Sequence, residues 1–343
     1  MGIIIAIVLF SVIVLFHELG HFVAARLNGI EVDEFALGMG PLLFSKEYKG
    51  TRYCIRALPI GGACMMGEDD EATGEEGNFH SKPVWARIMV IAAGPVFNFI
   101  MAFVLSVILT VMVGYDPPTV SEISQGSPAK EAGLQAGDRI VRMGNKKIHI
   151  FREISAYNQF HQGETVDVTY ERGGERHTVT IKPAYDEELD YYLLGVGRGA
   201  NQKAGFLTSL QYGAYEVKYW VCVTASGLKM LLTGRAGLDQ MFGPVGIVNM
   251  VDDAYTSSVS YGFSVIAANM MNMAILLSAN LGVMNLLPIP ALDGGRLVFL
   301  ILEAIRRKRV PPEKEGYVHF IGFALLMVLM VVVLYNDIRR LIL

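Results

Sequence analysis

The sequence contains four long stretches that are almost free of charged side chains, and these limit the fold more than any other feature. One of them, 262–292, has 31 consecutive residues without Asp, Glu, Lys or Arg. A helix needs about 20 apolar residues to cross the roughly 30 Å hydrocarbon core of a bilayer. We therefore expect four spanning segments, the first being a retained span rather than a signal peptide. Their ranges are 2–27, 88–114, 262–304 and 318–335.

The overall composition supports a membrane protein with an extramembrane part. Hydrophobic residues make up 52% of the chain and charged residues 18%, against about 25% charged in soluble globular domains. The net charge of −4 gives no electrostatic support for a nucleic-acid partner. The three cysteines form no CxxC pair, which argues against a disulfide framework and against a cysteine-bound zinc ion.

The polar segments between the apolar stretches differ in character. Residues 115–185 alternate short strand-like runs with turn signals, including Gly144-Asn145, and this pattern is typical of a small α+β domain. Residues 186–260 are predicted to form a juxtamembrane linker with one amphipathic helix at the membrane surface. The acidic stretch 68–76 is interpreted as a solvated loop. The two halves of the membrane domain are then 1–114 and 261–343.

The distribution of Lys and Arg predicts an orientation. Segment 26–87 contains seven of these residues and segment 306–314 contains five, and four spans place both segments on one side. That side should be cytoplasmic, because short cytoplasmic loops carry the excess of positive charge. The long segment between the second and third spans then lies outside the cell.

A cluster of ionisable residues interrupts the first apolar stretch. Residues 17–21 read His-Glu-Leu-Gly-His, the H-E-x-x-H pattern. Residues four apart on a helix differ by about 40° in direction and roughly 6 Å in height, so His17 and His21 can bind one zinc ion. Glu18 lies beside them, where it can accept a proton from water. The alternative, a pair of packed histidines, would place costly groups in lipid without a function.

A catalytic zinc site needs a third protein ligand, and Asp293 is the best candidate. It lies in segment 285–295, where two prolines and two glycines interrupt the third apolar stretch. Broken helices at membrane depth are tolerated around buried or wet sites. Glu31 and Glu34 have a suitable spacing but lie beyond the first apolar run. Asp293 could alternatively be a simple cap at a helix start.

At this point the sequence resembles the site-2 protease family of intramembrane zinc metalloproteases, and most closely its bacterial regulator-of-sigma-E protease branch. The resemblance covers nearly the whole chain. Four features carry it: the 17–21 motif, the Asn-x-x-Pro-x-Pro-x-Leu-Asp-Gly motif at 285–294, the Gly-Pro-Val-Phe-Asn motif at 94–98, and a PDZ-like insert at 115–185. Many relatives have two tandem PDZ domains, whereas this chain has room for one.

The resemblance implies roles for individual residues. His17, His21 and Asp293 would bind one Zn²⁺ per chain, and Glu18 would be the general base and acid. Residues 30–60 would form a membrane-re-entrant β-hairpin that offers an edge to an extended substrate. The remaining expected substrate-binding residues are Asn285, Asn98, Gly38 and Gly40. Asn285 could instead cap the broken helix, and Asn98 could simply pack between helices.

The expected fold is therefore a polytopic α-helical membrane protein with about four transmembrane helices, a re-entrant β-hairpin and one inserted extracytoplasmic PDZ-like α+β domain. The resemblance implies a multi-pass protease of the bacterial cell membrane. Its partners would be the lipid bilayer and single-span membrane proteins already trimmed by another protease, such as anti-sigma factors, or remnant signal peptides. Two alternatives are a non-catalytic scaffold, in which a PDZ-like domain binds partners, and a metal transporter.

Overall fold

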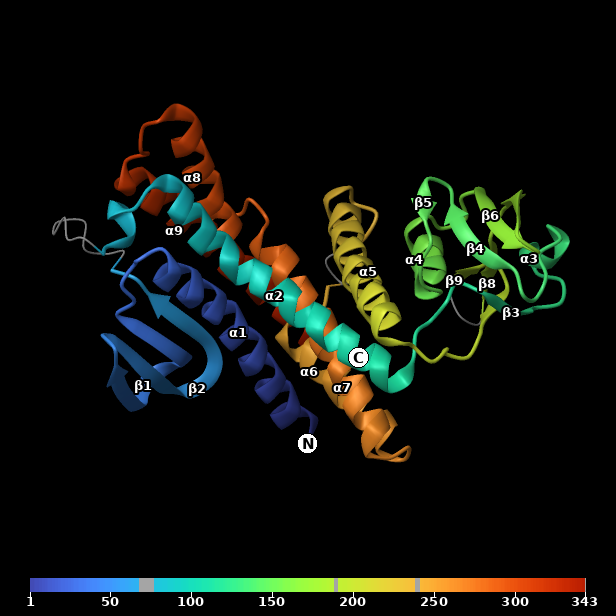
Figure 1. Ribbon diagram of the computed structural model, residues 1–343, viewed down its shortest axis with the longest axis horizontal. Coiled ribbons are helices and arrows are strands. Elements are labelled where there is room, and N and C mark those ends of the chain that lie inside the picture. Colours follow the sequence, from blue (N-terminus) through green and yellow to red (C-terminus); the bar gives the residue numbers. More distant parts are fainter. Residues whose placement is uncertain (68–76, 188–190, 238–240, 343) are drawn as a thin grey trace. The chain divides into compact units, whose positions relative to one another are not determined.

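The computed structural model describes residues 1–67, 77–187, 191–237 and 241–342 (Figure 1). Within these residues, four helices are long and apolar enough to cross a membrane, as the sequence predicts. They are α1 (Gly2–Leu27), α2 (Val84–Val113), α7 (Phe263–Asn285) and α9 (Pro312–Ile342). The acidic stretch interpreted as a loop, 68–76, lies outside the described residues.

The chain forms two compact units, and their boundary falls within α2. One unit contains residues 1–102 and 237–343, and the other contains residues 103–236. The sequence-based boundaries at 115 and 260 differ from these because α5 (Phe206–Leu232) packs on the last turns of α2. A Cβ on Gly213 of α5 would lie only 2.6 Å from Val107 of α2, so the two backbones are in close contact.

The third apolar stretch folds as two helices rather than one. After α7, residues 286–292 form a loop, and α8 (Asp293–Arg306) follows it. Pro288 and Pro290 lack a backbone N–H and cannot continue the hydrogen bonding of α7. The side chain of Arg87 in α2 forms a two-pronged ion pair with Glu303, which fixes α8 against α2.

The helix α6 (Pro244–Val259) packs against α1, α7 and α9. Two carboxylates form hydrogen bonds with backbone N–H groups at helix starts in this region. Asp337 of α9 accepts hydrogen bonds from the backbone N–H of Gly243 (3.1 Å) and Gly246 (2.8 Å) at the start of α6. Asp252 of α6 in turn accepts one from the N–H of Gly2 at the start of α1 (2.8 Å). Carboxylates at these positions satisfy N–H groups that have no partner within their own helix.

Strands β1 (Glu34–Tyr48) and β2 (Thr51–Met65) form a separate small sheet. The start of β1, 34–37, pairs with residues 52–55 on one side and with residues 62–65 on the other. Both partner segments belong to β2, so β2 turns between them; Gly61 in this part of β2 and Gly38 in β1 have φ angles of +85° and +86°, which favour glycine. Segment 62–65 is an edge of the sheet that pairs with no further strand among the described residues.

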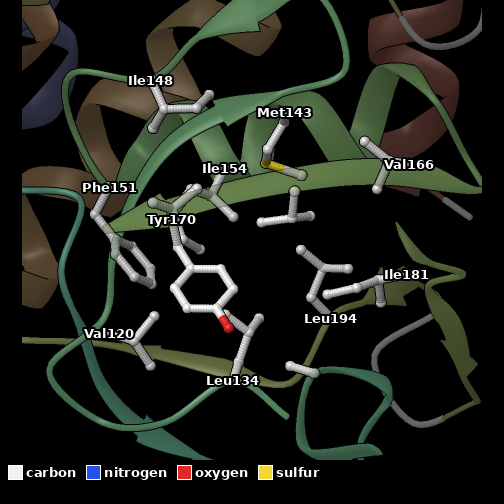
Figure 2. Packing of buried hydrophobic residues seen from close by; sticks show 13 residues of the cluster. Val120, Leu134, Met143, Ile148, Phe151, Ile154, Val166, Tyr170, Ile181 and Leu194 are labelled. Carbon is white, nitrogen blue, oxygen red and sulfur yellow. The ribbon is translucent and has the colours of Figure 1, made fainter. Parts of the chain in front are cut away.

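The second unit contains the inserted domain predicted from the sequence. A sheet of order β5-β4-β6-β7 packs with α4 (Arg152–Phe160) around a core that includes Leu134, Ile140 and Ile154 (Figure 2). The Gly144-Asn145 turn joins β4 to β5 in an antiparallel pair. The strands and the short helix are β3 (Val120–Ile123), α3 (Pro128–Glu131), β4 (Arg139–Met143), β5 (Lys146–Lys147), β6 (Val166–Arg172), β7 (Glu175–Ile181), β8 (Ala184–Asp186), β9 (Tyr191–Leu193) and β10 (Val196–Arg198).

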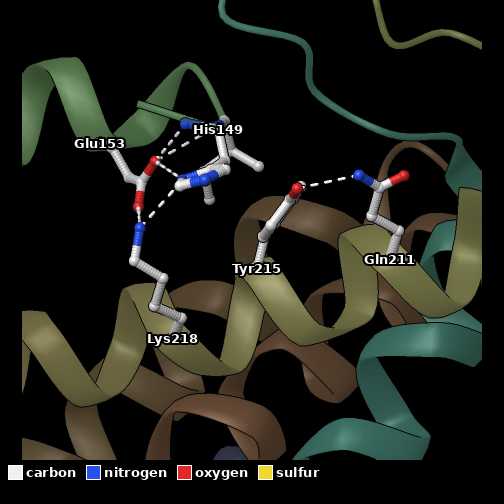
Figure 3. Close-up of polar contacts among 6 residues, drawn as sticks. His149, Glu153, Gln211, Tyr215 and Lys218 are labelled. Atoms are coloured by element: carbon white, nitrogen blue, oxygen red, sulfur yellow. Dashed lines mark hydrogen bonds and ion pairs between the residues drawn. The ribbon is translucent and has the colours of Figure 1, made fainter. Parts of the chain in front are cut away.

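The linker expected to hold one amphipathic helix holds two, α5 and α6, and only α5 belongs to the second unit. It contacts the inserted domain through a polar cluster (Figure 3). Lys218 Nζ donates to His149 Nδ1 (2.9 Å) and to Glu153 Oε1 (2.9 Å), and the ring of Tyr215 lies on the imidazole at 4.2 Å. These contacts fix α5 on α4.

We expect the attachment of α5 through this cluster to depend on pH. The pKa of His149 is lowered, mainly because the imidazole is partly buried and secondly because the positive charge of Lys218 is close to it. The charge of Lys147 also lowers this pKa, and the negative charge of Glu153 opposes the shift without reversing it. The unfolded state therefore binds more protons than the folded state as the pH falls through about 6.5, the ordinary histidine value. We expect the contact to contribute fully above about pH 7.5 and to weaken in acid.

The measurement is thermal unfolding of the wild type and of His149→Gln between pH 8 and pH 5. Glutamine accepts a hydrogen bond from Lys218 but does not titrate. The wild type should lose more thermal stability on acidification than the variant. Equal losses would show that His149 does not control this contact.

Candidate metal centre

Two helices and a loop bring three metal-binding side chains together. His17 and His21 lie on one face of α1, are 7% and 6% exposed, and have their Nε2 atoms 3.3 Å apart. Asp293 Oδ2, at the start of α8, lies 3.2 Å from Nε2 of His17 and 3.5 Å from Nε2 of His21. Ligands about 2.0–2.1 Å from a tetrahedral zinc ion are roughly 3.3–3.4 Å from each other. The three atoms therefore have the spacing of a zinc site.

The surroundings of Asp293 Oδ2 also favour a cation. This atom is buried, and it forms no hydrogen bond of normal geometry with any described residue although two imidazole nitrogens are close to it. A buried carboxylate oxygen without a partner is costly, whereas a bound metal ion satisfies it. Two imidazoles and one carboxylate are ligands that suit Zn²⁺.

Close packing of α1 against α2 depends on two glycines. A Cβ on Gly94 would lie 2.3 Å from His21 Nε2 and 2.8 Å from Cε1 of His17. A Cβ on Gly20 would lie 2.4 Å from the backbone oxygen of Ala93. Since neither position can hold a side chain, the glycine of the 94–98 motif creates the space that the two imidazoles occupy.

The helix α2 also orients both imidazoles. His21 Nδ1 lies 2.9 Å from the backbone carbonyl of Val90, so it donates and leaves Nε2 free for a metal. His17 Nδ1 lies 3.1 Å from the side-chain nitrogen of Asn98, which is fully buried. A neutral imidazole that binds metal through Nε2 carries its proton on Nδ1 and needs an acceptor there.

The acceptor is available on Asn98 itself. Its Oδ1 atom is buried and has no hydrogen-bond partner among the described residues. Oxygen and nitrogen of an amide are assigned from their contacts, and turning this amide over directs Oδ1 to His17, where it can accept a hydrogen bond from the Nδ1–H group. We therefore expect Asn98 to orient His17, and contact of Asn98 with a substrate stays a prediction.

This role predicts a specific effect of substitution at Asn98. Asn98→Leu should weaken zinc binding about 10- to 100-fold, because outer-shell partners of a ligand have effects of that size. Asn98→Asp retains an acceptor and should bind zinc more tightly than the leucine variant. Chelator competition measures the affinity. Ser278→Ala is the control, because Ser278 donates to the backbone carbonyl of Asn98 (2.8 Å) and not to His17. Unchanged affinity in Asn98→Leu would refute the assignment.

Glu18 lies between the metal ligands and the edge of the small sheet. It is half-buried, and a Cβ on Gly62 would lie 2.8 Å from its Cγ atom. A cavity of about 520 Å³ extends from this point, large enough for water and part of a chain. Its lining residues are His17, Glu18, His21, Asp33, Glu34, Arg52, Ala63, Cys64, Met65, Met66, Gly67, Ile91, Asp293 and Arg296.

The other candidate residues are not among the converging metal-binding side chains. Glu34 is buried in an ion pair with Arg52 (2.7 Å) and with Arg56, and Glu31 is exposed, so neither belongs to the group of metal-binding atoms. Asn285 is the last residue of α7 and is half-buried, and it is not among the residues that line the cavity.

Gly38 and Gly40, the two glycines expected to bind substrate, have positive φ angles of +86° and +84°. They lie where β1 bends, and neither lines the cavity. Their observed contribution is therefore to the shape of the small sheet, and contact with a substrate stays a prediction.

Comparison with known proteins agrees with this geometry. Residues 5–329 match the family model described as peptidase family M50. The chain belongs to peptidase family M50. This M50 peptidase is 35% identical to the zinc metalloprotease RasP of Bacillus licheniformis, over 98% of each chain. It is 33% identical to the regulator of sigma-W protease RasP of Bacillus subtilis, over 98% of this chain and 97% of that protein.

The family membership confirms the resemblance noted in the sequence. The chain is an intramembrane zinc metalloprotease, and the group formed by His17, His21 and Asp293 fits its zinc site. The four apolar helices indicate a multi-pass membrane protein. A part of the inserted domain is also similar to the PDZ domain of an SdrC-like protein from Listeria monocytogenes, with 27% identity, 25% of this chain and 90% of that chain covered, and a TM-score of 0.22.

Proposed function

We propose that this peptidase hydrolyses peptide bonds within the transmembrane segments of single-span membrane proteins. The observation that carries the proposal is the place of the metal ligands along spanning helices. His17 lies about 22 Å along α1 from Gly2 and about 15 Å from its other end at Leu27, at 1.5 Å per residue. A substrate must therefore enter the depth of the membrane to reach it.

The residues around the ligands support hydrolysis. When bound, zinc supplies the Lewis-acid chemistry that activates water near neutral pH. The carboxylate of Glu18 lies beside the ligands, where it accepts a proton from the attacking water and returns it to the nitrogen of the departing chain. The polar cavity gives water a route to this position.

The edge of the small sheet supports binding of an extended substrate. A transmembrane helix must unwind before its peptide bonds become accessible, and its N–H and C=O groups then need new partners. Segment 62–65 lies at the edge of the small sheet, where no further strand of the described residues pairs with it, and contributes Ala63, Cys64 and Met65 to the cavity. A substrate strand added to this edge would pass beside Glu18. Asn285 provides a further amide for the extended chain.

The charge of the loops supports an orientation in the membrane, and the name of one relative supports a substrate class. The positively charged loops favour an orientation in the bacterial cell membrane in which these loops face the cytoplasm. The zinc site then lies nearer the cytoplasm, and the inserted domain lies outside the cell. One relative is named as a regulator of sigma-W protease, which supports anti-sigma factors as a substrate class; remnant signal peptides are a second. A PDZ-like domain outside the membrane would bind chain ends or restrict access, so that substrates trimmed by another protease enter.

The test compares two substrates with the same apolar segment in proteoliposomes. One is a single-span protein with a short external tail, and the other retains a folded external domain. Mass spectrometry should locate the cut within the span, and the trimmed substrate should be cleaved faster. Cleavage confined to sequence outside the span would contradict the proposed substrate class.

A further inference from the structure

The loop that precedes Asp293 has an unusual backbone conformation. Ala291 has a φ of +74°, in the left-handed region that L side chains rarely adopt. Leu292 then takes the N-cap position of α8, and Asp293 is the first residue of that helix. The backbone conformation of Ala291, two residues before Asp293, therefore contributes to the direction in which α8 leaves the loop and to the place of its first carboxylate.

A side chain from α9 stabilises this conformation. The backbone N–H of Ala291 donates a hydrogen bond to Nδ1 of His319, at 2.8 Å. One turn further along α9, Gly322 allows close approach, since a Cβ there would lie 2.3 Å from Cβ of Pro290. The ring of Phe299 in α8 lies 5.6 Å from the imidazole. The loop is thus fixed by α9 at a hydrogen bond and at a backbone contact.

A displacement of the loop backbone would also displace Asp293, because the first turn of α8 packs directly on the loop. A Cβ on Gly294 would lie 2.0 Å from the backbone oxygen of Leu287, and a Cβ on Gly295 would lie 2.4 Å from that of Ile289. The first turn of α8 therefore rests directly on the loop backbone, without side chains that could adjust. Close packing of this kind transmits displacement instead of absorbing it.

We propose that His319 is a positioning residue for the zinc site, which acts by holding Ala291 in its left-handed conformation and so placing Asp293. Its Nδ1 accepts a hydrogen bond and carries no proton. His319 is not among the three converging metal-binding side chains. The proposal rests on the proposed ligand role of Asp293.

Two substitutions at His319 separate positioning from packing. The side-chain oxygen of asparagine occupies nearly the position of Nδ1, whereas the amide of glutamine extends to the position of Nε2. We expect His319→Asn to bind zinc almost as tightly as the wild type. His319→Gln and His319→Leu should bind it about 10- to 100-fold more weakly, the effect typical of outer-shell partners.

A second substitution tests the role of the backbone. Glycine adopts the left-handed region without strain and needs no support from His319. Ala291→Gly alone should change zinc affinity little, and it should restore most of the affinity in the His319→Leu chain. A residue that only packs α9 against α8 would not be replaced by a glycine on the loop.

The readout is zinc affinity from chelator competition, with cleavage of a single-span substrate measured in parallel. Wild-type affinity in both His319→Gln and His319→Leu, or no recovery in the double variant, would overturn the proposal. If the leucine variant fails to fold, equal affinities of the asparagine and glutamine variants would overturn it. Zinc retention in Asp293→Ala would instead refute the ligand assignment, so the two failures are distinguishable.

Discussion

Replacing Glu18 by glutamine should lower the rate of substrate cleavage by about two to four orders of magnitude while zinc remains bound. Glutamine has the shape of glutamate but cannot accept a proton from water, and general-base catalysis contributes roughly 10²- to 10⁴-fold. Zinc should stay bound because the ligand atoms belong to His17, His21 and Asp293 and not to Glu18. The measurement is the single-turnover cleavage rate of a single-span substrate, with the zinc content determined on the same preparation.

Glu31→Gln is the matched control, because it makes the same chemical change on an exposed glutamate close by in the sequence. It should leave the rate and the zinc content unchanged. Unchanged turnover in Glu18→Gln would exclude Glu18 as the general base. Retained biological activity together with that result would favour a scaffold instead of a protease.

Replacing Asp293 by alanine should release zinc and abolish cleavage together. The substitution removes one of three ligand atoms and leaves a two-histidine site, so the affinity should fall by more than the roughly 10- to 100-fold typical of outer-shell partners. Chelator competition and metal analysis measure this loss. It differs from the effect of Glu18→Gln, in which zinc is retained.

Asp33→Ala is the control for this experiment. Asp33 lines the same cavity but is not among the three converging ligand atoms, so its variant should retain zinc. If Asp293→Ala kept a full zinc content at high chelator concentration, the third ligand would have to be another residue. Restoration of cleavage by added zinc in Asp293→Ala would show a weakened rather than abolished site.

The features that the sequence predicts well are local or periodic. The pairing of His17 with His21 depends only on helical spacing, and four runs of uncharged residues suffice to predict four apolar helices. The turn at Gly144-Asn145 is fixed by the backbone preferences of two residues. Asp293 could be chosen because ionisable residues near a broken membrane helix are rare, although only the fold brings it within 3.5 Å of both imidazoles.

The features that the sequence could not predict depend on tertiary contacts. Asn98 points to His17 because of the rotation of α2 about its axis, which no motif encodes. The support of Ala291 by His319 joins residues 28 positions apart through a hydrogen bond to the backbone. The double pairing of segment 34–37 requires β2 to turn between its two partner segments, and alternation of side chains does not reveal this turn.

The zinc environment itself gives the most direct test of this account. X-ray absorption at the zinc edge of the purified protein should show two imidazole nitrogens and carboxylate oxygen at about 2.0–2.2 Å. The carboxylate contribution should be lost when Asp293 is replaced in protein reconstituted with excess zinc. Sulfur at about 2.3 Å, or a spectrum unchanged by replacement of His17 and Asp293, would contradict the assignment of the three ligands.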